Sequence, residues 1–136
     1  MKEDITLLAV QEYSSLASGT AALDALVKEA PVTILGTRIV TPGKFLILLT
    51  GDVASVEAAL NAGREVSRES LIGELFIPNL HPDVVPALTA KGRDLPIDAL
   101  GILETVSVAS GIAAADEGAK HSDVRILEIR IGEGMG

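Results

Sequence analysis

The chain has 136 residues, a formal net charge of −8 and no cysteine. This length accommodates one small domain plus a fragment and excludes two domains of ordinary size. The acidic charge and the 2% aromatic content argue against a nucleic-acid partner, because phosphate would be repelled and stacking side chains are scarce. The lack of cysteine excludes disulfides and thiolate-held metal clusters and indicates a cytoplasmic protein. The longest strongly apolar stretch, Phe45 to Thr50, is too short to cross a membrane, and we expect no membrane contact.

Periodicity and turn residues predict six elements in the first part of the chain. Pro31 ends the first helix, and Thr41-Pro42-Gly43 is typical of a tight turn between two strands. The order β-α-β-β-α-β predicts an α/β (α+β) sandwich with its helices on one side of a mainly antiparallel sheet. The predicted elements are a strand at Ile5–Gln11, a helix at Leu16–Glu29, strands at Val32–Val40 and Lys44–Leu49, a helix that follows its N-cap Asp52 and ends near Gly63, and a strand at Leu71–Ile77.

The chain also repeats itself at an offset of 92 residues, as from Leu8 to Leu100. We call two residues separated by this offset equivalent. The match runs without a gap, which indicates duplication. The other matching pairs are Glu12 and Glu104, Ser18-Gly19 and Ser110-Gly111, Ala21-Ala22 and Ala113-Ala114, Asp24 and Asp116, Lys28 and Lys120, Val32 and Val124, Leu35 and Leu127, Arg38 and Arg130, and Ile39 and Ile131.

The duplication predicts a complete domain at 1–92 and the first part of a second copy at 93–136. The proline-rich connector at 78–96 is predicted to hold one short helix around Val84 to Leu88. In the second copy we expect β-α-β, with a strand at Ala99–Glu104, a helix at Ala109–Lys120 and a strand at Val124–Ile131. The sequence stops in the turn after that strand. We therefore expect an uncovered apolar face that needs a partner surface or further chain.

Several linked motifs resemble the shell-protein domain of bacterial microcompartments, and the tandem arrangement is similar to its trimeric subclass. The resemblance implies three chains that imitate a hexamer, tile edge to edge into a shell, and surround a central pore. The motifs are Pro42-Gly43-Lys44-Phe45, Thr50-Gly51-Asp52-Val53, Val56-Glu57-Ala58-Ala59, Ala62-Gly63, Ala22 through Lys28, Pro31-Val32, and Ile77 through Pro82.

The resemblance also implies roles for particular residues. The pore-lining turns would be Val40, Thr41, Pro42 and Gly43 in the first copy and Gly132, Glu133 and Gly134 in the second. The tile-edge residues would be Lys28, Lys120, Asn79 and His81, although Asn79-Leu80 stands where many members carry Arg-Pro. One relative in the tandem subclass has a cysteine at the position of Thr41, which holds an iron–sulfur cluster. A threonine hydroxyl does not replace a thiolate as an iron ligand, so we expect no cofactor.

Four acidic residues and two histidines are the remaining candidates for chemistry. His81 and His121 have no ligand or base at metal or catalytic spacing, so we interpret them as structural or solvated. Glu12 and Glu104 could form an acid/base pair, but each ends a strand before a helix, which favours binding of nearby backbone N–H groups. Asp24 and Asp116 each precede a lysine by four residues, which is typical of an ion pair and could also orient that lysine at a subunit edge.

No arrangement of nucleophile and base emerges, so the chain is not predicted to be an enzyme. We expect a structural shell protein that partners with itself as a homotrimer and with other shell proteins, around a pore for small polar metabolites. Glu133 would add a ring of negative charge to that pore. The alternative is a ring-forming ligand-sensing regulatory protein, similar in outline to nitrogen-signalling regulators, that binds a small molecule between subunits.

Overall fold

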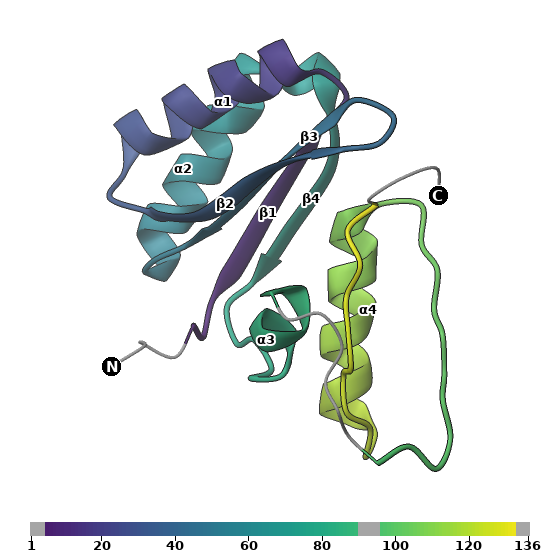
Figure 1. The fold of residues 1–136 in the computed structure, drawn as a ribbon. Coiled ribbons are helices and arrows are strands. Elements are labelled where there is room, and N and C mark those ends of the chain that lie inside the picture. The colour runs from purple at the N-terminus through teal and green to yellow at the C-terminus, as the bar shows by residue number, and fades with distance from the viewer. Residues whose placement is uncertain (1–4, 90–95, 133–136) are drawn as a thin grey trace.

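The computed structural model describes residues 5–89 and 96–132 (Figure 1). The predicted order of elements is confirmed through the first copy, with ends that shift by at most a few residues. The elements are β1 (Leu8–Tyr13), α1 (Leu16–Glu29), β2 (Thr33–Val40), β3 (Lys44–Thr50), α2 (Val53–Val66), the 3-10 turn η1 (Arg68–Ser70), β4 (Leu71–Ile77), α3 (Val84–Thr89) and α4 (Val108–His121).

The four strands form one antiparallel sheet in the order β2-β3-β1-β4. Val10 in the centre of β1 lies opposite Leu48 of β3 on one side and Leu75 of β4 on the other. Because β1 is central, all six of its residues are buried. Successive side chains of a strand point to opposite faces, so this strand supplies both faces of the sheet with core residues.

The two faces of the sheet carry different helices (Figure 1). On one face, Ala9 and Tyr13 of β1 pack with Leu26 of α1 and Leu60 of α2. On the other face lies a second core, formed by residues of the sheet, of α3 and α4, and of the segments that follow β4 and α4: Leu8, Val10, Val40, Leu46, Leu48, Ile77, Leu80, Val84, Ile112 and Ile131. The expectation of helices on one side therefore holds for α1 and α2, whereas α3 and the second copy's α4 cover the other face.

Short polar side chains begin the three long helices. Asp52 accepts a hydrogen bond from the Ser55 backbone N–H at 2.9 Å, which confirms its predicted role as an N-cap. Ser15 and Ser107, which are equivalent residues, cap α1 and α4 through the backbone N–H groups of Ser18 and Ser110. The duplication thus extends to the capping residues.

The second copy differs from its prediction in both strands. Its helix forms as α4, but 99–104 and 124–131 have no strand structure. In the first copy, β1 and β2 are held by hydrogen bonds to β3, and among the described residues no strand pairs with either segment of the second copy. Unpaired backbone does not gain the ladder bonds that define a strand. The β-α-β prediction for this part is therefore wrong in its strands and correct in its helix.

Candidate functional site at the junction of the two copies

The first predicted pore turn contacts Gly132, the one described residue of the second. The backbone N–H of Thr41 donates to the Gly132 carbonyl oxygen at 3.4 Å. A Cβ atom at Gly132 would lie 2.8 Å from Cγ1 of Val40, so the close approach requires glycine. Gly43 has a φ of 114°, which also favours glycine in the first turn. Glu133 and Gly134 lie outside the described residues.

Glu12 joins the two copies through a buried carboxylate. Its Oε2 accepts the backbone N–H of Val108, the first residue of α4, at 3.1 Å. Its Oε1 lies 3.3 Å from Nζ of Lys44, which also donates to the Val106 carbonyl oxygen at 3.4 Å. The expected binding of helix N–H groups by Glu12 is confirmed, but the helix belongs to the other copy. A carboxylate at a helix N-terminus is favoured because the orphan N–H groups there carry partial positive charge.

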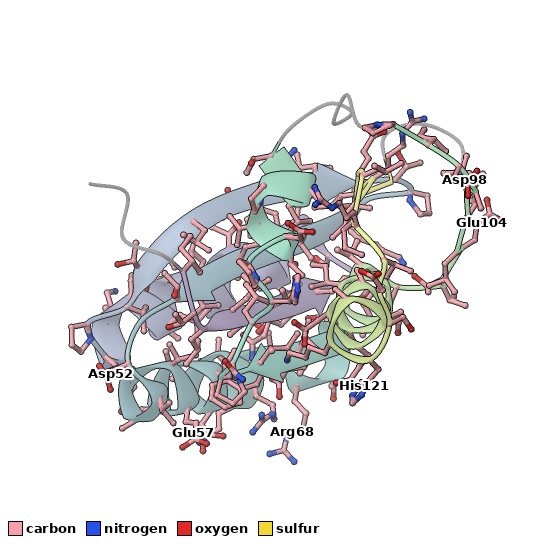
Figure 2. The ribbon with its side chains drawn as sticks, turned by 90° about the horizontal axis from the view of Figure 1, so that it is seen from below. Asp52, Glu57, Arg68, Asp98, Glu104 and His121 are labelled. Carbon is pink, nitrogen blue, oxygen red and sulfur yellow. The ribbon has the colours of Figure 1, made fainter. Side chains whose placement is uncertain are left out.

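Glu104, the equivalent of Glu12, is exposed on the segment that runs outside α4 (Figure 2). Glu12 is buried in the sheet, whereas Glu104 faces outward. Their arrangement gives no support to a shared acid/base role, which would need two carboxyl groups facing one substrate.

Asp116 makes a second connection between the copies. Its Oδ1 accepts the backbone N–H of His81 at 2.7 Å, and its Oδ2 lies 2.5 Å from Nζ of Lys120. The equivalent pair, Asp24 and Lys28, has a similar separation of 2.6 Å. Both predicted ion pairs are therefore confirmed. They differ in environment, because the Asp116 side chain is 2% exposed and the Asp24 side chain 61% exposed.

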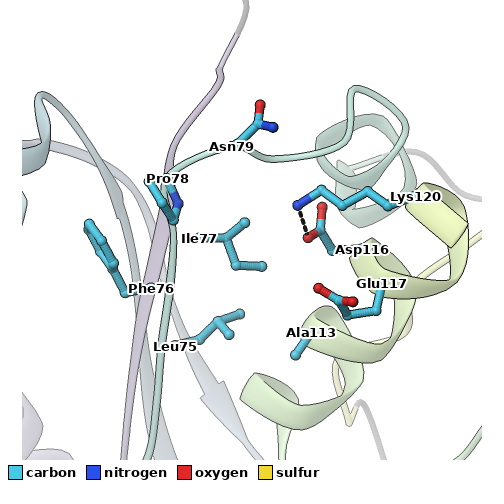
Figure 3. Close-up of a pocket in the computed structure, with 9 residues that line it drawn as sticks. All are labelled: Leu75, Phe76, Ile77, Pro78, Asn79, Ala113, Asp116, Glu117 and Lys120. Atoms are coloured by element: carbon cyan, nitrogen blue, oxygen red, sulfur yellow. Dashed lines mark hydrogen bonds and ion pairs between the residues drawn. The ribbon is translucent and has the colours of Figure 1, made fainter.

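A largely apolar groove of about 360 Å³ lies between β4 and α4 (Figure 3). Leu75 and Ile77 lie on the strand side, and Ala113 on the helix side. The polar groups at its rim include Asp116 and Lys120, which already bind each other. With these two charges satisfied within the chain, the groove offers few free polar groups to orient a small ligand.

The predicted tile-edge residues fall into two environments. Lys28 and Asn79 are exposed, whereas Lys120 and His81 are partly covered by the junction of the two copies. Nδ1 of His81 accepts the Asp83 backbone N–H at 3.2 Å, and Nε2 of the exposed His121 lies 3.2 Å from Glu117. These contacts agree with structural and solvated roles. Over the ranges 5–89 and 96–132, no group of three or more potential metal ligands occurs.

A buried polar network under α2 was not anticipated from the sequence. Gln11 donates to the Leu60 carbonyl oxygen at 2.9 Å and to Glu74 at 2.7 Å, and the Tyr13 hydroxyl donates to Oε1 of Gln11 at 2.7 Å. Arg64 completes the network through Glu74. Burial, and secondarily the negative charge of Glu74, raises the pKa of Tyr13. The signal for this network in the sequence was one polar residue, Gln11, in an otherwise apolar strand.

Known proteins of one family resemble this chain over most of its length. The BMC-domain family model matches residues 8–80 and 99–136. The microcompartment shell protein PduT of Citrobacter freundii is 37% identical over 95% of this chain and 70% of its own length. Shell protein PduA of Salmonella typhimurium is 35% identical over 57% of this chain and 84% of its own length. The expected similarity to the propanediol-utilization shell protein T is thereby confirmed.

A solved structure supports the same assignment. A microcompartment protein from Desulfitobacterium hafniense superposes with a TM-score of 0.81 and 41% identity, over 96% of this chain and 73% of that one. In the described part of the chain, no helix has the length and apolar character needed to traverse a membrane. The matched relatives are shell components and not enzymes. The chain belongs to the BMC-domain family and is a structural protein of the bacterial microcompartment shell.

Proposed function

We propose that three copies of this chain close a pseudo-hexameric tile whose central pore passes small polar metabolites. The contact between Thr41 and Gly132 carries the proposal, because it joins equivalent turns of neighbouring copies at 3.4 Å. Repeating this relationship around a closed ring would gather six turns at one axis. The same proposal divides the chain into copies at 1–92 and 93–136. Each chain then supplies two of the six positions in the ring.

The proposed pore is polar and acidic. Gly132 and Thr41 offer backbone groups rather than long side chains, which leaves room for a solute. Glu133 follows in the sequence, and three copies of it would form a ring of negative charge that disfavours anions. The carbonyl and hydroxyl groups of the turns suit neutral polar solutes. With Thr41 in place of a cysteine, the axis would serve as a pore without an iron–sulfur cluster.

The outer edge of the tile would use Lys28, Lys120, Asn79 and His81 to contact other tiles and other shell proteins. Lys28 is the strongest candidate, because its side chain is 71% exposed near the end of α1. We expect Lys28→Ala to leave the trimer intact but to reduce the growth of sheets in electron microscopy. Glu57→Ala, on the exposed side of α2, is a control that removes a charge elsewhere.

Native mass spectrometry and electron microscopy test the assembly. The expected result is a trimer that packs into flat hexagonal sheets at high concentration. A hexamer joined only through first copies would contradict the tandem ring. Discrete rings that never form sheets, together with a thermal shift on adding a nucleotide or metabolite, would instead support the ligand-sensing alternative.

Transport through reconstituted shells tests the pore. Glu133→Gln removes the proposed ring of charge without changing side-chain size, and we expect faster entry of small anions with little change for neutral solutes. Unchanged anion exclusion in this variant would contradict a role of Glu133 in selectivity.

A further inference from the structure

Lys44 is the charged residue closest in sequence to the first pore turn. The stretch from Ile39 to Gly51 contains no other charged residue. Its backbone pairs with that of Val40 where β2 and β3 meet, directly beside the turn. In a tile built as proposed above, three copies of Lys44 would stand around the pore. Free ammonium groups at that place would attract anions.

The ammonium group of Lys44 is not free, because Glu12 binds it. Nζ of Lys44 lies 3.3 Å from Oε1 of Glu12 and 3.4 Å from the Val106 carbonyl oxygen. The Glu12 side chain is 0% exposed and the Lys44 side chain 26% exposed. The pair carries no net charge, and the lysine is held against the junction of the two copies.

The register of the sheet explains why these two side chains meet. Glu12 of β1 lies opposite Leu46 of β3. Lys44 precedes Leu46 by two residues, so its side chain shares a face of the sheet with Leu46, in the core beside α4. Without Glu12, the flexible four-carbon stem of Lys44 would let its ammonium group move through the solvent around the turn.

We propose that Glu12 is a positioning residue for pore selectivity, because it binds Lys44 and cancels the positive charge beside each first-copy turn. The acidic pore then depends on two residues: Glu133 supplies negative charge, and Glu12 neutralises the nearest cation. This role is separate from the bond between Glu12 and the Val108 N–H, which uses the other carboxylate oxygen. The inference rests on the proposed pore and names a second determinant of its charge.

Entry of quenchers into reconstituted shells tests the effect on selectivity. A dye enclosed in the shell is quenched by iodide, an anion, and by acrylamide, a neutral solute. Glu12→Gln is expected to raise the ratio of iodide entry to acrylamide entry about threefold, because each site changes from neutral to a charge of +1. The amide keeps an acceptor for the Val108 N–H, so we expect a folded trimer, which circular dichroism and native mass check. An unchanged ratio in that trimer would overturn the proposal.

Two further variants isolate the charge of Lys44. Glu12→Gln combined with Lys44→Met removes both charges together, so no charge is left without its partner, and the ratio should return to the wild-type value. Glu57→Gln removes one negative charge from the exposed side of α2, near the end of β3 that lies away from the turn, and should leave the ratio unchanged (Figure 2). A ratio that stays raised in the double variant would show that the effect does not act through Lys44 and would overturn the proposal.

Lysine acetylation gives a readout that begins with the wild-type protein. An N-hydroxysuccinimide acetate, followed by mass spectrometry, should modify Lys44 several-fold more slowly than Lys28, whose side chain is 71% exposed. In Glu12→Gln the rate at Lys44 should rise while the rate at Lys28 stays the same. Equal rates at the two lysines in the wild-type tile would show that Glu12 does not hold Lys44 and would overturn the proposal.

The outcomes separate this inference from the proposed function. If Glu133→Gln changes the entry of anions and Glu12→Gln does not, the role of Glu12 is overturned and the pore stands. If shells that contain the wild-type tile admit acrylamide no faster than shells that lack it, the proposed pore is overturned and this inference with it.

Discussion

The Glu12 carboxylate and the Val108 backbone N–H lie 3.1 Å apart although 96 positions separate them. This bond joins the central strand of the first copy to the first turn of the second copy's helix. Nζ of Lys44 lies 3.3 Å from the other carboxylate oxygen, so each oxygen of Glu12 has a partner. The Glu12 side chain is fully buried. The junction of the copies is therefore held by a specific polar contact inside an apolar core.

We expect Glu12→Ala to lower the free energy of unfolding by about 2 kcal/mol, because it removes hydrogen bonds to a charged group and leaves the Val108 N–H unpaired. Glu12→Gln keeps one acceptor oxygen and should cost about half as much. Urea unfolding measures both values, and hydrogen exchange should show faster exchange at the start of α4. Equal stability of the alanine variant and wild type would contradict this role.

The equivalent aspartates provide a matched pair of substitutions. Asp116→Ala should lower the unfolding free energy by about 2 kcal/mol, since it leaves the His81 N–H and a partly covered Lys120 without their acceptor. Asp24→Ala removes a pair of the same spacing from an exposed surface and should change stability by less than about 0.5 kcal/mol. Both are measured by urea unfolding of dilute, unassembled protein. Similar losses of unfolding free energy in both variants would show that burial at the junction does not set the strength of the ion pair.

Gly19 is expected to tolerate no side chain. A Cβ atom there would lie 2.8 Å from Cβ of Phe45 and 2.3 Å from its Cδ1, so Gly19→Ala should destabilise the chain by about 2 kcal/mol through overpacking. Gly118→Ala is the control, because a Cβ there meets nothing within 4 Å, and it should stabilise α4 by roughly 0.5 to 1 kcal/mol. The melting temperature, measured by circular dichroism, should fall for Gly19→Ala and rise for Gly118→Ala.

The raised pKa of Tyr13 predicts a loss of stability in alkali. Burial keeps the phenol protonated in the folded chain, whereas the unfolded phenol titrates near its usual pKa of about 10. The unfolded state therefore binds fewer protons above that pH, and stability falls as the pH rises. In Tyr13→Phe this part of the pH dependence should disappear. Parallel stability curves for the two proteins between pH 9 and pH 12 would contradict the assignment.

Much of the fold could be predicted because its signals are local. The helix at Leu16–Glu29 and the strand at Leu71–Ile77 have the predicted bounds. Helical periodicity and Pro31 mark the helix in the sequence, and a mainly apolar run marks the strand. The Asp24–Lys28 pair follows from helical spacing alone. The strands expected at 99–104 and 124–131 did not form, because a strand depends on a neighbour that periodicity does not reveal.

The sequence named candidate residues for the site but did not reveal their contacts. The sequence placed Val40–Gly43 and Gly132 in equivalent turns, but it did not show that Thr41 and Gly132 touch. From the sequence we expected Glu12 to bind N–H groups of the helix that follows its own strand. In the structure it binds the N–H of Val108 in α4. The network that joins Gln11 and Tyr13 of β1 to Arg64 of α2 and Glu74 of β4 had no periodic or motif signal, because it spans three separate elements.

The sequence by itself determined the duplication, the shell-protein family and the element order of the first copy, since these depend on residue identity and spacing along the chain. Only the tertiary structure decided which surfaces of the two copies meet. Equivalent residues have the same local preferences, yet Asp116 is buried and Asp24 exposed, and Glu12 is enclosed while Glu104 faces outward. Burial depends on what packs against a residue, and for the second copy that partner is the sheet of the first.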